Sequence, residues 1–400
     1  IILDTFEQIA EFAEETVGHW LVVAPSLQFL VTSRQALDLE AEKLVECTPL
    51  DLTRKGKGMA EATTLFVDRA KQVAPNISTQ ARDIEKVVRI ARRLDGNPLA
   101  IELAAAQMSE FTLDKLLRQL NRRFEILTRK DERSGSPRRQ QTLHAAMEWS
   151  WELLKPFEQA ALAQCSVFRA GFDPEAAEVV IDLSKFEKVP WTVEVLQSLR
   201  KKSLLNMREP DEFPGEIRYK LDQTIRDFAR EMLRRSGDRT TTRARHANYY
   251  LEIGESLRRT VGAEKDIAWK RLDLEMGNLL AVHQRSLANK KMTESLVNQS
   301  IGAALAMHPV LSRRGPLERY LLLLDSSIDA LARVPVDSEI ELEIRIARGQ
   351  TRRARGILSA AKQDLNRALD LAKSTHDEAA EGRVRTELGA IHMEAGQLKA

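Results

Sequence analysis

Cysteine is nearly absent: Cys47 and Cys165 are the two cysteines among 400 residues. Because they lie far apart in the sequence, a disulfide framework is not expected, and a reducing cytoplasm fits the chain. No apolar stretch reaches the ~20 residues that a membrane-spanning helix needs, so we expect no membrane partner. Aromatic residues make up only 5%, with 18 glycines and 13 prolines, a balance that favours helices. The net charge of +2 argues against a protein that binds polyanions over its whole surface.

A phosphate-binding loop is also missing from the sequence. No G-x-x-x-x-G-K-S/T motif occurs, and the nearest text, Lys-Gly-Lys-Gly at residues 55–58, follows no convincing strand and lacks the Ser/Thr. The first residues still carry a related pattern, because an apolar run ends on Asp4. P-loop NTPases present their magnesium-organising carboxylate in this way, at the carboxyl end of a buried parallel strand. With no initiator methionine, we interpret the chain as a fragment of a longer regulatory ATPase, cut after its phosphate loop.

The length of the chain predicts about two to four structural units. Residues 1–57 alternate between strand and helix patterns, which predicts the C-terminal part of a parallel α/β domain. We expect strands at residues 1–3, 28–32 and 44–47, a helix at residues 6–17, and a short apolar run at residues 21–23.

Residues 58–127 change to a helical pattern. Ala62, Phe66 and Ala70 share one helix face, and a second such face follows at residues 84–91. A Gly-Asn-Pro break at residues 96–98 precedes an Ala-rich helix, and residues 113–120 add a fourth. The pattern predicts a small helical subdomain.

A polar, charged stretch at residues 128–140 is the clearest predicted linker. The next segment, residues 141–236, shows three helical patterns followed by two short strands around a Pro- and Gly-containing turn, which is typical of a winged helix. We expect the helices at residues 143–154, 158–167 and 193–202, and the strands at residues 204–207 and 217–221.

Residues 237–400 are almost entirely helical and predict a helical repeat array. Gly349 and Gly356 each recur 40 residues further on, and small residues follow at tetratricopeptide spacing. The period exceeds the usual ~34 residues, and Arg348 occupies a position that is normally apolar. We interpret these segments as degenerate repeats.

The order of these segments resembles the STAND class of signal-transduction ATPases, in the NB-ARC-like bacterial branch with tetratricopeptide-type repeats. Residues 1–7 resemble its Walker B segment, with Thr5 where Asn is usual, and residues 30–34 resemble its sensor strand. Residues 96–105 resemble its Gly-x-Pro helix start. The winged-helix likeness is carried by residues 142–168 and 219–229, and the start of the repeat region by Trp269, Leu272, Glu275, Asn278 and Leu279.

The resemblance implies a nucleotide site for ATP or ADP with Mg²⁺. Asp4 would help to hold the metal, and Glu7 is the substitute for a general base, since Thr5 cannot take a proton from water. Arg34 would sense the γ-phosphate with help from Ser33, and Pro98 would pack against adenine. Each of these roles has a plainer alternative. Asp4 would be a helix N-cap, and Glu7 would interact favourably with the positive end of a helix dipole. Arg34 would be a surface arginine after a strand, and Pro98 would simply start a helix.

The function implied by the resemblance is a regulatory switch. With ADP bound, the winged helix would fold onto the nucleotide domain, and a protein partner or small-molecule inducer received by the repeats would permit ATP exchange and self-association. Thr5 argues for slow turnover, and without its phosphate loop the chain is not expected to bind nucleotide tightly.

Two alternatives stay open. One is a transcription activator whose winged helix binds DNA through Arg200, Lys201 and Lys202, although we interpret these residues as a solvated basic helix end. The other is a repeat scaffold with a decayed ATPase.

Overall fold

A computed structural model describes most of the chain. The described part omits residues 5, 7, 8, 34, 35, 41, 46, 54–58, 78, 79, 95, 121–137, 290, 335 and 395–400, together with the side chains of residues 138–143 and 145. The chain divides into two compact units, Ile1–Asp51 and Leu52–Ala400.

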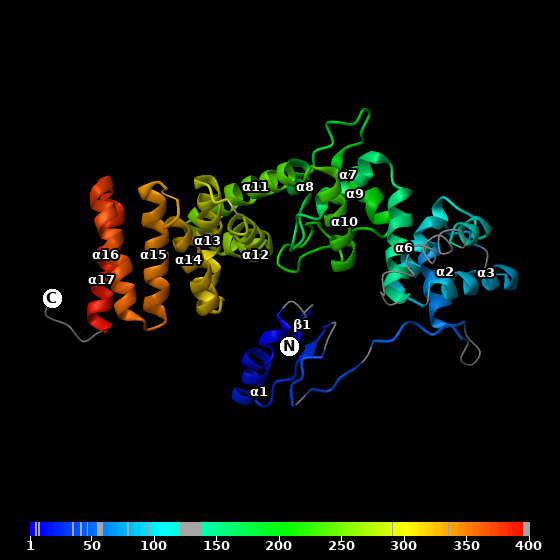
Figure 1. The fold of residues 1–400 in the computed structure, drawn as a ribbon, viewed down its shortest axis with the longest axis horizontal. Helices are drawn as coiled ribbons and strands as arrows, with labels where there is room; N and C mark the ends of the chain where they lie inside the picture. Colours follow the sequence, from blue (N-terminus) through cyan, green and yellow to red (C-terminus); the bar gives the residue numbers. More distant parts are fainter. Residues whose placement is uncertain are drawn as a thin grey trace. The chain divides into compact units, whose positions relative to one another are not determined.

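The first unit is a small α/β segment. Strand β1 (Ile2–Leu3) pairs in parallel with β2 (Leu30–Val31), in the register Ile2 to Leu30 and Leu3 to Val31. Between the strands, the chain forms a 3₁₀ turn (Ala10–Phe12), a π-helical turn (Glu14–Gly18) and helix α1 (His19–Val23). Buried Phe6, Ala13 and Val17 form the core of this unit. The strand pair is at the start of the chain, coloured blue in Figure 1.

Two expectations for this unit are corrected. The helix predicted at residues 6–17 appears in the described residues as short turns that continue to residue 23, past its predicted end. Phe6 lies in a 3₁₀ turn, and its N–H donates to the carbonyl of Thr32 at 2.9 Å. The apolar run at residues 21–23 continues the helix, where Trp20 stacks on Phe29. The strand expected at residues 44–47 is wrong for the described residues: Leu44 and Val45 lie 70% and 76% exposed in irregular structure, with no strand beside them to pair with.

The second unit begins with a helical subdomain. It contains α2 (Glu61–Val73), α3 (Ala81–Arg93) and α4 (Pro98–Ala106), followed by a 3₁₀ turn (Gln107–Ser109) and a helix at residues 113–120. Ala62, Phe66 and Ala70 of α2 are buried, as are Val87 and Ala91 of α3, and α2 packs on both α3 and α4. Helix α6 (Arg138–Glu152) follows, so residues 138–140 are helical instead of linker. Their Arg and Gln side chains are good helix formers. The rest of the predicted linker lies outside the described residues.

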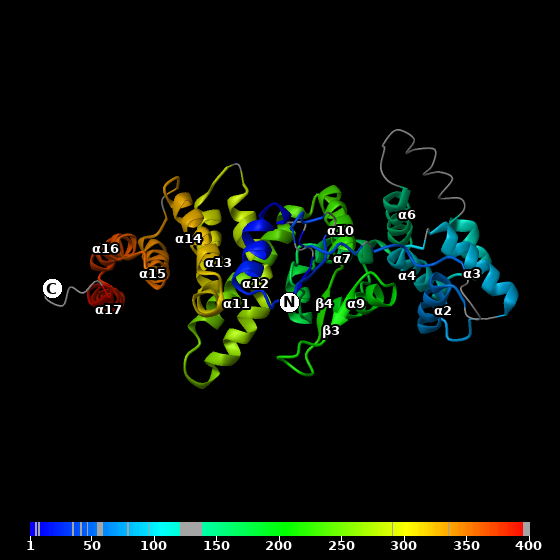
Figure 2. The ribbon, with the colours of Figure 1, turned by 90° about the horizontal axis from the view of Figure 1, so that it is seen from below.

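The winged helix follows. It consists of α7 (Pro156–Cys165), α8 (Pro174–Val180), α9 (Thr192–Lys201), the antiparallel strands β3 (Asn206–Arg208) and β4 (Arg218–Lys220), and α10 (Gln223–Ser236). The sequence pattern missed α8, whose start carries a recognisable signal: Asp173 accepts a hydrogen bond from the Ala176 N–H at 2.7 Å, and Pro174 follows at the first helical position. Figure 2 shows α7, α9 and α10 around the strand pair.

The remaining residues form an array of helices, each of which packs on its neighbours in the sequence (Figures 1 and 2). The array comprises α11 (Arg239–Arg259), a 3₁₀ turn (Gly262–Glu264), α12 (Lys265–Leu287), α13 (Glu294–Arg314), α14 (Leu317–Leu331), α15 (Ser338–Ala354), α16 (Leu358–Thr375) and α17 (Glu378–Glu394). Gly349 is a close-approach site, because a Cβ there would lie 2.7 Å from Leu365 Cγ. Its counterpart Gly389 has open space around it.

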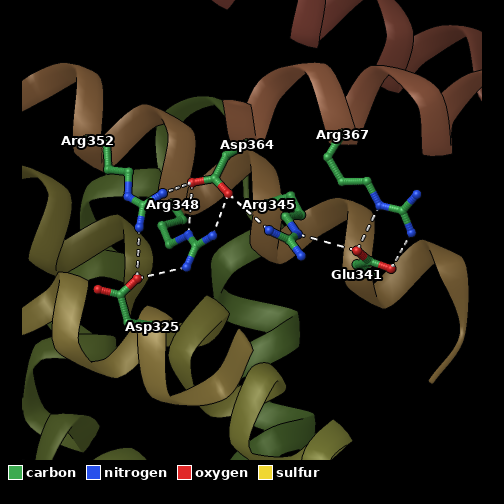
Figure 3. A network of polar contacts seen from close by, with 7 residues as sticks. All are labelled: Asp325, Glu341, Arg345, Arg348, Arg352, Asp364 and Arg367. Atoms are coloured by element: carbon green, nitrogen blue, oxygen red, sulfur yellow. Dashed lines mark hydrogen bonds and ion pairs between the residues drawn. The ribbon is translucent and has the colours of Figure 1, made fainter. Parts of the chain in front are cut away.

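An ion-pair network explains the arginine at a normally apolar repeat position. Arg348 donates to both oxygens of Asp364, which is 2% exposed, and also pairs with Asp325 at 2.8 Å. Arg345 and Arg352 donate to the same Asp364 (Figure 3). The network joins α14, α15 and α16 through charges that satisfy one another.

The predicted fold class is confirmed: the chain is mainly α, with an α/β segment, a helical subdomain, a winged helix and a helical repeat array.

Candidate nucleotide site and winged-helix junction

Asp4 and Thr32 lie side by side at the carboxyl ends of β1 and β2. The Thr32 hydroxyl donates to Asp4 Oδ1 at 2.5 Å, and the Thr32 N–H donates to the carbonyl of Leu3. Ser33 follows directly and is exposed. The parallel register brings these oxygen-bearing side chains together, because both strands end at the same edge of the sheet. The contribution of Thr32 was missed by sequence reasoning, although Thr32 lies one residue before the predicted Ser33.

A magnesium ion would find hard oxygen ligands at this edge, as the predicted cofactor requires. Among the described residues, no group of three or more His, Cys, Asp or Glu side chains is placed to hold a metal. Asp4 therefore fits Mg²⁺ only as a single carboxylate beside a hydroxyl, with water and phosphate oxygens completing the coordination, which is how Mg²⁺ is commonly held. Glu7 and Arg34, the predicted base and sensor, lie outside the described residues, as does the Lys-Gly-Lys-Gly stretch.

Pro98 lies in the second unit, at the first position of α4. The side chain of Asn97 caps the helix by accepting from the Ala100 N–H at 3.0 Å, and Gly96 takes a positive φ of 66° that suits glycine. These contacts account for the Gly-Asn-Pro sequence as a helix start. A contact of Pro98 with adenine stays a prediction.

The basic end of α9 is smaller than its sequence indicates. Lys202 donates to both oxygens of Glu158 at 2.8 and 2.7 Å, and the Ser198 hydroxyl donates to the same carboxylate. Burial raises the pKa of Glu158, but the hydrogen bonds from Lys202, Ser198 and the Lys155 N–H lower it more, so its pKa lies below the ordinary value. Lys202 is therefore a structural partner of a buried carboxylate, and only Arg200 and Lys201 remain exposed.

The surface that a winged helix would present to DNA carries acidic as well as basic side chains. The N-terminal end of α9 holds Glu194, which accepts from the Trp191 N–H at 3.1 Å, and Trp191 itself is 77% exposed. The loop between β3 and β4 exposes Glu209, Asp211 and Glu212. Arg208 and Lys220 are exposed on the strands, but the carboxylates at the loop would repel a phosphate backbone.

A buried polar network fastens the winged helix to α12. Arg218 on β4 forms an ion pair with Glu275, and the two side chains are 3% and 8% exposed. Asn278 donates to the carbonyl of Gly171 at 2.9 Å and accepts from the Arg169 N–H at 2.8 Å. Both α12 residues belong to the segment that resembled the start of the repeats, so the sequence pattern marked the residues that make this junction.

The same junction is closely packed. Gly277 on α12 lies against Ala170, where an added Cβ would be 2.7 Å from the Ala170 Cβ. At the end of the wing, Arg271 pairs with Glu216, and its guanidinium lies 4.1 Å from the centroid of the Phe213 ring. The wing and the loop after α7 are thus held against the first repeat helices by charge and by contact.

The comparisons with known proteins agree with the winged helix. Residues 154–234 match the winged helix-turn-helix domain family. A Mycobacterium bovis protein named "Putative HTH-type transcriptional regulator" is 32% identical over 297 residues, which are 74% of this chain and 32% of that protein. An "Uncharacterized protein" of Mycobacterium tuberculosis is 31% identical over 258 residues, which are 64% of this chain and 63% of that protein. The chain thus spans about a third of the length of the first relative and less than two thirds of the second.

A solved STAND protein with a tetratricopeptide repeat sensor, from Pyrococcus horikoshii, aligns with 100% of this chain and 60% of its own chain, at 16% identity and a TM-score of 0.42. That score is too low to establish a shared fold. Within the described residues, no helix is both long enough and apolar enough to cross a lipid bilayer. The chain contains a winged helix-turn-helix domain and is similar in sequence to mycobacterial proteins, one of which carries the name of a transcriptional regulator.

Proposed function

We propose that this chain is the switching part of a regulatory, nucleotide-dependent protein of the STAND class that acts in signal transduction or transcription. In this proposal, the repeats receive a protein partner or a small-molecule inducer, and the winged helix passes the change on to a nucleotide domain. The relative named as a transcriptional regulator supports a regulatory role. Asp4 and Thr32, at the shared edge of two parallel strands, support a nucleotide domain that begins this chain.

The observation that carries the proposal is the buried junction of Arg218, Glu275 and Asn278. A winged helix held by buried charges against the first repeat helices cannot shift relative to them without breaking those bonds. A ligand that binds the repeats in one arrangement better than in another therefore changes the energy of the winged helix as well. The switch would use this coupling to alter nucleotide affinity and self-association.

The nucleotide part is tested on the coding sequence upstream of Ile1. A G-x-x-x-x-G-K-S/T segment is expected there, and the longer protein should bind ADP with an affinity that Asp4→Asn lowers about tenfold in the presence of Mg²⁺. The matched control is Asp51→Asn in the same unit. An upstream sequence without the motif would contradict the proposal, as would ADP binding that is equally strong in the Asp4→Asn protein.

The second candidate is a regulator whose winged helix reads DNA directly, and the match of residues 154–234 to the winged helix-turn-helix family favours it. The exposed carboxylates of the wing and the pairing of Lys202 disfavour it. Fluorescence anisotropy with random duplex DNA at low salt separates the two. We expect no binding that depends on Arg200 and Lys201. Salt-dependent binding that is lost in the Arg200→Gln/Lys201→Gln protein would favour the DNA-reading function.

A further inference from the structure

An arginine cluster lies where α10, α11, α12 and the loop after α7 meet. Its members are close enough for their charges to repel one another. Burial, together with the weaker repulsion by Arg243 and Arg230, lowers the pKa of the Arg285 guanidinium to about 9. Burial and neighbouring guanidinium groups lower the pKa of Arg169, Arg226 and Arg243 in the same direction. We define the cluster as Arg169, Arg226, Arg230, Arg239, Arg243 and Arg285.

Two of these guanidinium groups keep buried N–H groups without acceptors. Arg285 donates through Nη2 to the carbonyl of Val167 at 2.7 Å, but its Nη1 is buried and has no hydrogen-bond partner among the residues that the structure describes. Arg226, which is 8% exposed, donates through Nη2 to the carbonyl of Leu221 at 3.0 Å, while its Nε is buried without a partner in the described part of the chain. Buried donors in native proteins are nearly always satisfied, so these two N–H groups require an acceptor that the described residues do not supply.

Among the described residues, the acidic groups beside the cluster are fewer than its arginines. Asp227 pairs with Arg230 at 3.1 Å, and Asp222 lies near Arg226. In the described part of the chain, Arg239 and Arg243 form no hydrogen bond or ion pair. The repeat network of Figure 3 is the instructive contrast, because there the arginines share the buried carboxylate Asp364. In the junction cluster, Arg226 and Arg285 donate to backbone carbonyls, Arg169 donates to the Gln284 side chain at 2.7 Å, and Arg230 pairs with a carboxylate, that of Asp227.

We propose that this cluster binds the phosphate group of a small anionic ligand. Guanidinium groups match phosphate oxygens in a bidentate way, and several of them around one site favour an anion with at least two charges. The cluster includes residues of the winged helix and of the first two repeat helices, so a bound phosphate bridges these elements and stabilises their junction. The inference rests on the cluster alone and is independent of the nucleotide switch proposed above.

The test is titration calorimetry of the 400-residue chain with inorganic phosphate and pyrophosphate, at constant ionic strength maintained with chloride and without Mg²⁺. We expect saturable binding of pyrophosphate and a rise in the unfolding temperature with its concentration. Arg243→Gln should weaken pyrophosphate binding about tenfold, because it removes a charge-assisted contact. The matched control, Arg235→Gln, removes the same charge from the outer side of α10, where Arg235 pairs with Glu231, and should leave binding unchanged.

A second variant keeps the test decisive if Arg243→Gln does not fold: Arg239→Gln alters an exposed member of the cluster and should also weaken pyrophosphate binding.

An ADP titration distinguishes the source of the phosphate. ADP binding that falls in the Arg243→Gln protein but persists in Asp4→Asn assigns a nucleotide to the cluster, whereas binding of phosphate or pyrophosphate alone assigns the free anion. The proposal is overturned if pyrophosphate does not bind, or binds equally well to both cluster variants. Arg243-dependent binding of duplex DNA without pyrophosphate binding would also overturn it.

Discussion

Glu158 shows at the scale of one residue how an apparent surface charge becomes an interior group. In the sequence it is one more acid at the start of a helix, but its side chain is 3% exposed and accepts from Lys202, Ser198 and the Lys155 N–H. A carboxylate of this kind is stable inside the protein only while its partners remain. Lys202 is therefore withdrawn from the basic helix end that the sequence indicates.

The stability of the winged helix should depend on pH through Glu158. Because its pKa in the folded protein lies below the ordinary value of 4.5, its contribution is present above that value and is lost as the pH falls through the folded pKa. At pH 7, Glu158→Gln should lower the free energy of unfolding by about 2–3 kcal/mol. On acidification, the variant should lose less of its free energy of unfolding than the unmodified protein does. Urea unfolding at pH 7 and pH 3.5 measures both. The exposed Glu187→Gln serves as the control, and an unchanged acid profile in Glu158→Gln would contradict the prediction.

The Arg218–Glu275 pair should behave as a coupled unit. Arg218→Met leaves a buried carboxylate without its partner and should cost about 3 kcal/mol, whereas the Arg218→Met/Glu275→Leu double variant should recover much of that loss. A double-mutant cycle from urea unfolding provides the coupling energy. If the destabilisation of the double variant equals the sum of the two single-variant destabilisations, the pair does not hold the junction.

At the scale of elements, the structure follows the predicted order of helices and strands, with differences that have local causes. The helices predicted at residues 158–167 and 193–202 correspond to α7 and α9, each displaced toward the N-terminus by one or two residues. Helix α8 lacked enough residues to show a periodic pattern. The predicted strand at residues 44–47 had the right residue types, but residues form a strand only where a partner strand accepts their hydrogen bonds.

The packing of α12 against the winged helix should depend on Gly277. Gly277→Ala places a methyl group against Ala170 and should destabilise the protein by about 1–2 kcal/mol, opposite in sign to the usual gain for Gly→Ala within a helix. Amide exchange should rise in residues 169–172 and in β4. The matched control is Gly382→Ala in α17, where the new methyl group meets nothing within 4 Å and should stabilise the helix. Equal stabilisation by both substitutions would rule out close packing at Gly277.

At the scale of the whole molecule, the proposal gives the winged helix a transmitting role. The surface that would face a duplex exposes Glu194, Glu209, Asp211 and Glu212 as well as basic residues, while the surface that faces α12 is held by a buried ion pair. The repeat network around Asp364 likewise joins three successive helices, so displacement of one helix is resisted by its neighbours.

The 400-residue chain should not bind ATP with micromolar affinity at the Asp4 edge. Most of the affinity of such sites comes from backbone N–H groups and a lysine around the phosphates, and the sequence has no G-x-x-x-x-G-K-S/T motif to provide them. Calorimetric titration of ATP in the presence of Mg²⁺ tests this. Micromolar binding that Asp4→Asn abolishes would contradict it.

The sequence by itself determined the class of the fold and the order of its parts. Helix periodicity, the Gly-Asn-Pro helix start and the strand pair of the wing are local features, and local propensity and solvent exposure are enough to indicate them. The nucleotide roles of Asp4, Glu7, Ser33, Arg34 and Pro98 came from resemblance alone and stay predictions. Only the tertiary structure decided which charges are paired: Lys202 with Glu158, Arg218 with Glu275, Arg348 with Asp364. These partners lie from 16 to 57 residues apart, and a sequence pattern does not specify which distant side chains meet when their helices pack.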